Sequence, residues 1–135
     1  MSFAFGRELR LCSAADFKQV FDHTDIKVSN RHLLILAREN NLDHPRLGLV
    51  IAKKNIRFAT GRNRVKRHIR ETYRLNQDDL GNLDIVVLAR RGLGELESCD
   101  INKLLTRQWS KLHQKLGDRQ ARRQASQQKQ QLEAS

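Results

Sequence analysis

Apolar residues recur along this chain with two different periods, and each change of period marks a new element. Residues at helical spacing follow a Ser-x-x-Asp start signal and predict a short helix over about 14–22. Two unbroken apolar runs predict strands at about 32–38 and 47–52, antiparallel to each other through the polar loop between them. An extra strand near 26–28 would bring the total number of strands to four.

The second half of the chain alternates in the same way. Apolar residues every four positions predict a helix over about 62–75, and a run at 84–89 predicts a further strand. A last helix starts at Ser98 or Asp100 and carries an apolar stripe that ends at Leu116. The order predicts an α/β (α+β) sandwich of two layers, with one mixed sheet of three to four strands and three helices.

The length of 135 residues fits one domain. We place this domain at 1–116, because the regular apolar pattern ends there. The remainder, 117–135, is rich in Gln, Arg, Ala and Ser and has one large apolar residue, Leu132, so we expect a disordered tail.

Charge narrows the class of partner. The formal net charge is +11 and the pI is about 10.5, a surplus that a polyanion would neutralise. No apolar run reaches the roughly 18 residues of a transmembrane helix, and the first residues lack the apolar block of a secretory signal, so we expect no membrane partner. Cys12 and Cys99 lie far apart without CxxC spacing, which indicates free thiols and a reducing, cytoplasmic location.

The densest chemical signal lies on the predicted helix over 62–75. One side carries apolar residues for packing, and the rest is almost wholly cationic. A solvated face would normally mix both signs, whereas Glu71 is the only acid here, which favours binding to a polyanion. The candidate RNA-binding residues are Arg62, Asn63, Arg64, Lys66, Arg67 and Arg70.

Two aromatic residues, Phe17 and Phe21, lie one turn apart on the first helix. Core packing is the usual role of such a pair. The alternative is a platform on which single-stranded bases stack. The pattern leaves both open.

Catalytic chemistry has little support in the sequence. Asp78, Asp79 and Asp84 are close along the chain, but no nucleophile and base accompany them, so we expect neither a catalytic residue nor a protein-bound metal. His68 and His113 are interpreted as surface residues, and a DNA-binding turn-helix pair is absent before the basic helix.

The ordered motifs of residues 5–116 resemble those of the bacterial ribonuclease P protein family. The most specific is Arg-Asn-Arg-x-Lys-Arg-x-x-Arg at 62–70. Before it stands a strand that ends in Ala52-Lys53-Lys54, and near the N-terminus Arg7-x-x-Arg-Leu precedes Asp16-Phe17-x-x-Val20-Phe21. A ribosomal protein would share the composition but not this ordered set.

The resemblance implies a left-handed crossover around the basic helix, contrary to the general rule of handedness. It also implies that an RNA subunit hydrolyses the substrate with Mg²⁺, while the protein contacts that catalytic RNA and the single-stranded 5′ leader of precursor tRNA. The residues implied for the leader are Phe17, Phe21, Leu36, Lys53 and Lys54. Leu36 departs from members that carry Tyr in this strand, so stacking on the leader is expected to differ.

Overall fold

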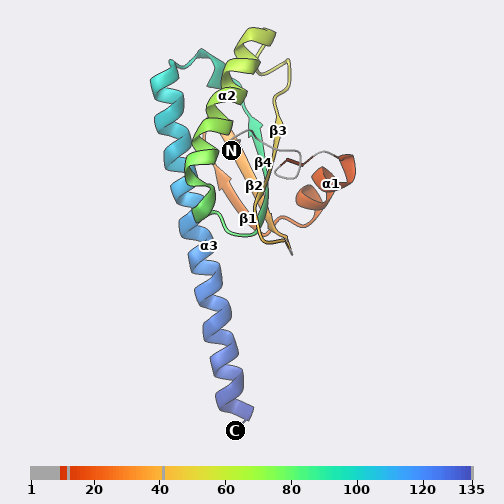
Figure 1. The fold of residues 1–135 in the computed structure, drawn as a ribbon, viewed down its shortest axis with the longest axis vertical. Helices are drawn as coiled ribbons and strands as arrows, with labels where there is room; N and C mark the ends of the chain where they lie inside the picture. The colour runs from red at the N-terminus through yellow and green to blue at the C-terminus, as the bar shows by residue number, and fades with distance from the viewer. Residues whose placement is uncertain (1–9, 12, 41, 135) are drawn as a thin grey trace, which may run out of the picture.

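The computed structural model describes residues 10–11, 13–40 and 42–134 and places three helices and four strands in them (Figure 1). In chain order the elements are α1 (Ala14–Asp22), β1 (Ile26–Ser29), β2 (Leu33–Glu39), β3 (Arg46–Val50), α2 (Ala59–Asn76), η2 (Gln77–Asp79), β4 (Leu83–Ala89), η3 (Leu93–Glu95) and α3 (Ser98–Ala134). The start of α1 follows the predicted signal, since the Ser13 hydroxyl accepts a hydrogen bond from the Asp16 N–H at 3.1 Å.

The sheet is mixed and has the strand order β1-β2-β4-β3. β2 pairs antiparallel with β1 and with β4, whereas β3 pairs parallel with β4. β2 and β3 therefore run in opposite directions, as expected, but they do not pair with each other, so the expectation of a hairpin through the loop was wrong. β4 lies between them because all but one of its seven side chains are buried, as a central strand covered on both faces requires.

Alternate residues of the strands face two different layers of helix. Ile35 and Val87 belong to the main core beneath α2 and α3, whereas their neighbours Leu36 and Val86 pack with Val20 of α1. Figure 1 shows α2 and α3 on one side of the sheet and α1 on the other. The predicted sandwich of one mixed sheet and three helices is confirmed.

Helix α2 connects the parallel strands β3 and β4, and it runs beside α3. The indole N–H of Trp109, which is 1% exposed, donates to the Thr72 hydroxyl at 2.9 Å. His68 contacts the Asn102 side chain at 2.7 Å and is buried. The interpretation of His68 as a surface residue was wrong, because its position on α2 turns it toward α3.

Helix α3 continues beyond the predicted end of the domain. It remains helical to Ala134, whereas the sequence predicted disorder after residue 116. Gly117 does not break it, and the Gln, Arg and Ala residues that follow are good helix formers. Arg119 pairs with Asp25 and Glu39 at 3.3 Å, and Arg123 pairs with Glu39 at 2.7 Å. These ion pairs hold the first turns after Gly117 to the ends of β1 and β2.

Within the described part of the chain, no helix is long and apolar enough to cross a membrane. Cys99 is an exposed free thiol at the start of α3, and Cys12 lies outside the described residues.

Candidate nucleic-acid interface

The outer side of α2 presents cations to solvent. Asn63, Arg67 and Arg70 are exposed and Lys66 is half-buried, while Val65 and Ile69 on the inner side are completely buried. The side chains of Arg67 and Arg70 make no hydrogen bond or ion pair with the described residues, so both guanidinium groups are available to an external anion. The helix therefore separates a packing side from a cationic side, as the sequence predicted.

Two of the predicted RNA-binding arginines are instead occupied inside the protein. Arg62 donates from Nη1 to the carbonyl oxygens of Ile56 and Arg57, at 3.0 and 2.9 Å. These bonds fasten the start of α2 to the loop before it. Because the guanidinium is already bonded to backbone carbonyls, phosphate binding by Arg62 would compete with the packing of this loop.

Arg64 is bonded more extensively than Arg62. Its Nη2 donates to the carbonyl oxygens of Gly94 and Leu96, at 2.7 and 3.0 Å, and its Nη1 lies 3.3 Å from the Ser98 hydroxyl. Arg64 thus fixes η3 and the first turn of α3 against α2. The partners lie about 30 residues away along the chain, so no local pattern could have identified this role.

Three of the predicted leader residues belong to α1 or to the sheet face that α1 covers. Leu36 is 9% exposed and packs with Val20 of α1. Phe17 is half-buried, and its ring lies so close to Gly48 that a Cβ there would be 2.7 Å from the ring. Phe21 is 43% exposed. Gly48 therefore allows Phe17 to lie on the backbone of β3, and Phe21 is the more accessible aromatic.

Beyond α1, the same sheet face is only partly covered. Leu34, Leu88 and Val50 stand opposite one another on three adjacent strands and are half-buried. The exposed side chains of Lys53 and Lys54 follow directly after this row. The sequence analysis missed the row, although the alternation of faces along β2 and β4 could have revealed it.

A pocket of about 190 Å³ connects α1 to α2 across the edge strand β3. Phe17 of α1 and the cations Lys66 and Arg70 of α2 line it together. Phe17, which was expected to contact the leader, therefore lies beside two residues that were expected to contact the catalytic RNA. The complete lining is Arg10, Leu11, Phe17, Leu47, Gly48, Leu49, Lys66 and Arg70.

The acids considered for hydrolysis are not arranged for catalysis. The Asp84 carboxylate is buried and accepts two hydrogen bonds from Arg46, at 2.8 and 2.6 Å, and one from Asn40 at 2.8 Å. Burial raises the pKa of the Tyr73 phenol, and the Asp84 charge adds to that shift, so the phenol stays protonated near neutral pH. Asp78 and Asp79 are exposed in η2.

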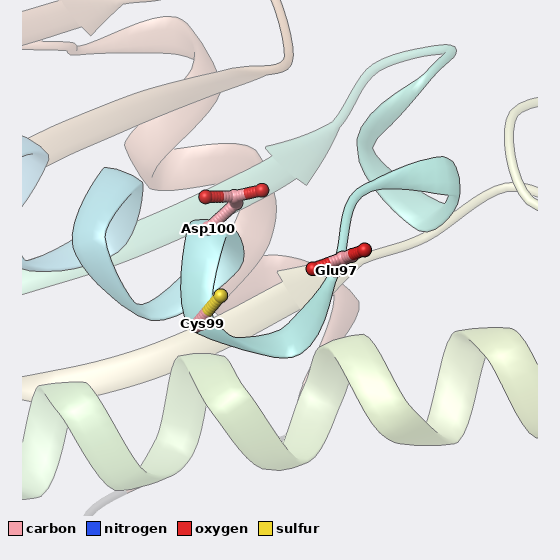
Figure 2. Close-up of side chains that lie close together, drawn as sticks. All are labelled: Glu97, Cys99 and Asp100. Carbon is pink, nitrogen blue, oxygen red and sulfur yellow. The ribbon is translucent and has the colours of Figure 1, made fainter.

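Figure 2 shows the one group of possible metal ligands in the described residues, at the passage from η3 into α3. Glu97, Cys99 and Asp100 each offer a ligand atom within 4.8 Å of the others, and all three are exposed. The set does not fit Mg²⁺, which prefers oxygen ligands alone. The acids instead suit the N-terminus of α3, where negative charge is favourable.

Comparison with known proteins gives a consistent result. Residues 5–113 match the family model described as Ribonuclease P. The ribonuclease P protein component of Azotobacter vinelandii is 56% identical over 108 residues, which cover 80% of this chain and 83% of the relative.

Two solved structures share the fold. The RNase P protein from Thermotoga maritima is 33% identical with a TM-score of 0.62, and the match covers 73% of this chain and 96% of that one. A Staphylococcus aureus RNase P protein mutant, described as having defective mRNA degradation activity, is 28% identical with a TM-score of 0.72, over 77% of this chain and 87% of that one.

Proposed function

This chain belongs to the ribonuclease P protein family, and from that premise we propose that it binds the catalytic RNA of ribonuclease P and the 5′ leader of precursor tRNA at two adjoining surfaces. It is a ribonuclease P protein component that acts in tRNA processing and partners the RNase P RNA. The residue assignments are our own.

Catalytic RNA binds the outer side of α2 in this proposal. Asn63, Lys66, Arg67 and Arg70 contact the RNA directly, since they are exposed or half-buried on one helix. Arg62 and Arg64 contribute mainly by fixing the starts of α2 and α3 through backbone carbonyls. A planar guanidinium matches phosphate bidentately, so Arg67 and Arg70 supply most of the direct binding.

The leader crosses the sheet face beside α1. Phe21 and Phe17 offer aromatic surface for stacking, Leu36 and the neighbouring row of apolar side chains support it, and Lys53 and Lys54 meet the phosphates. The observation that carries the proposal is the pocket lined by Phe17, Lys66 and Arg70. It makes the two surfaces continuous, so that a leader held against α1 reaches the RNA held against α2.

Hydrolysis is assigned to the RNA subunit, with Mg²⁺ held mainly by RNA. The described acids support this division, because the exposed cluster in Figure 2 includes a thiol and Asp84 is occupied by Arg46. The protein contributes positioning and charge neutralisation. We place the complex in the cytoplasm and expect neither a membrane nor DNA as a partner.

The test is a cleavage assay on precursor tRNA with the protein, the cognate RNA subunit, or both. The two together should release the leader faster than the RNA subunit alone, with the largest advantage at low Mg²⁺, and the protein with Mg²⁺ alone should release none. Leader removal by the protein alone would contradict the assignment of catalysis to RNA.

A second substrate belongs in the same assay. The Staphylococcus aureus relative is described in terms of mRNA degradation activity, so an mRNA should be incubated with the protein alone. We expect no cleavage of it without the RNA subunit, because the described acids form no magnesium site. Degradation in that arm would make the protein a nuclease in its own right.

A further inference from the structure

Helix α3 carries a row of cations that the assignments above do not use. Lys103, Arg107, Lys111 and Lys115 follow one another at intervals of four residues, and no Asp or Glu occurs between residues 101 and 117. Each interval advances about 6 Å along the helix, so the row spans about 18 Å. Like charges at this spacing disfavour a helix, so selection for solubility alone does not account for the row.

The first three members of the row are open to solvent. The side chains of Lys103, Arg107 and Lys111 are exposed and make no hydrogen bond or ion pair with the described residues. Lys115 is exposed too, but its ammonium group donates to the Lys27 carbonyl oxygen at 2.7 Å. We call Lys103, Arg107 and Lys111 the α3 row.

The α3 row points away from both α2 and the core. Asn102 and His113 mark the side of α3 that meets α2, through His68 and the Asp79 carbonyl oxygen. At about 100° per residue, the row lies roughly 100–180° around the helix from Asn102. It is therefore a cationic surface separate from the outer side of α2, although both belong to one layer (Figure 1).

We propose that the α3 row is a second binding surface for the phosphate backbone of the catalytic RNA. Three exposed cations in line, without an aromatic neighbour among them, suit the repeated charge of an RNA backbone rather than single bases. The proposal rests on the function proposed above, which supplies the catalytic RNA as the polyanion.

The position of the α3 row favours the catalytic RNA over the substrate. The leader surface lies on the α1 side of the sheet, whereas the α3 row lies in the opposite layer, which also contains α2. An RNA that binds the outer side of α2 reaches the α3 row by crossing the exposed side of α3. A large folded RNA therefore contacts two helices of one layer, which the salt dependence of binding should reveal.

The test compares two variants of the full chain. The first, Lys103→Gln/Arg107→Gln/Lys111→Gln, removes the three charges of the α3 row. The second also carries Lys103→Gln but keeps the other two cations and moves them about 100° around the helix by exchanging neighbours, Thr106→Arg/Arg107→Thr and Ser110→Lys/Lys111→Ser. Thermal melts show whether both variants fold as the parent does.

Binding to the catalytic RNA is measured for each variant between low and moderate salt. The first variant should bind about tenfold more weakly at low salt and lower the salt slope by about two to three, since each lost phosphate contact removes roughly 0.7–0.9. The second should bind almost as weakly, although it retains two more cations than the first. If the second variant bound the catalytic RNA as tightly as the parent, net charge alone would explain the loss in the first variant, and the proposal would be overturned.

The remaining outcomes separate this inference from the proposed function. If the parent binds the catalytic RNA and the first variant binds equally well, the α3 row is not a binding surface, and the proposed function stands. If only binding of precursor tRNA to the assembled holoenzyme weakens, the row contacts the substrate and the choice of catalytic RNA is wrong. If the parent itself does not bind the catalytic RNA, the proposed function fails first.

Discussion

The guanidinium of Arg64 and that of Arg67 lie one turn apart on α2 and differ in what surrounds them. Arg64 donates to two backbone carbonyl oxygens and contacts a hydroxyl, whereas Arg67 is exposed and without a described partner. Arg64 therefore has a structural role, whereas the Arg67 side chain is available to bind RNA. Mutations at the two positions should separate stability from RNA affinity.

Arg64→Ala should lower the free energy of unfolding by about 1–3 kcal/mol, because it leaves carbonyl oxygens of Gly94 and Leu96 without their donor. Arg67→Ala should change stability by less than about 0.5 kcal/mol, while weakening RNA binding by about 1–3 kcal/mol through loss of a bidentate contact. Urea unfolding and titration with the catalytic RNA measure the two quantities. Equal stability losses at both positions would refute the distinction.

Phe21→Ala and Phe17→Ala should likewise differ in how much stability they cost. Phe21 is 43% exposed, so its loss should cost under about 1 kcal/mol of stability, whereas Phe17 lies against Gly48 and should cost about 1–3 kcal/mol. Phe21→Ala should weaken binding of long-leader precursor tRNA by about 1–3 kcal/mol and leave mature tRNA unaffected. The two substrates are compared on one mutant holoenzyme.

A thermal melt of the Phe21→Ala protein serves as the control for folding. An equal loss on long-leader and leaderless substrates would assign Phe21 to folding rather than to the leader. The residue pattern of α1 predicted an aromatic pair but not this difference, because the close approach of Phe17 depends on Gly48 of a strand about 30 residues away.

Among the elements, α3 departs most from expectation. Its apolar stripe predicted the core contacts of Trp109 and Leu112, both of which are buried. The stripe ends at Leu116, and composition alone then predicted disorder. The ion pairs of Arg119 and Arg123 with acids of β1, β2 and their flanks depend on how the sheet edge is placed, which no local pattern contains.

Glu39→Gln tests these ion pairs, since Glu39 pairs with both Arg119 and Arg123. Partly exposed pairs contribute about 1 kcal/mol or less, so the melting temperature should hardly change. Amide hydrogen exchange over residues 118–126 should accelerate several-fold, because the helix there loses a fastening to the sheet. Glu95→Gln, an exposed acid of η3, is the matched control and should leave these amides unchanged.

The order of the strands in the sheet could not be predicted from the sequence either. The apolar runs predicted the positions of β2, β3 and β4, but the loop between β2 and β3 suggested a hairpin. A hairpin would place β4 at an edge, where one row of its backbone groups would be unpaired and its apolar faces poorly covered. Burial of all but one of the side chains of β4 decides for the central position.

At the scale of the whole molecule, the net charge of +11 should govern the effect of the protein. Its enhancement of leader removal should be greatest at low salt and low Mg²⁺, because binding by lysines and arginines releases counterions from RNA and weakens as salt rises. Cleavage rates with and without protein, measured over a series of salt concentrations, give the enhancement. An enhancement that is constant across the series would contradict the electrostatic account.

The central position of β4 has a consequence for how the protein is made. Synthesis proceeds from the N-terminus, so β1, β2, β3 and α2 leave the ribosome before the strand that joins them. Until β4 is complete, β3 lacks its neighbouring strand and α2 can cover only the β1–β2 pair, so pairing over long sequence separations must wait. The nascent chain therefore exposes unpaired strand edges and a cationic segment at the same time. Binding of RNA to that segment during translation would compete with the arrival of β4, which makes folding before assembly the safer order for this protein.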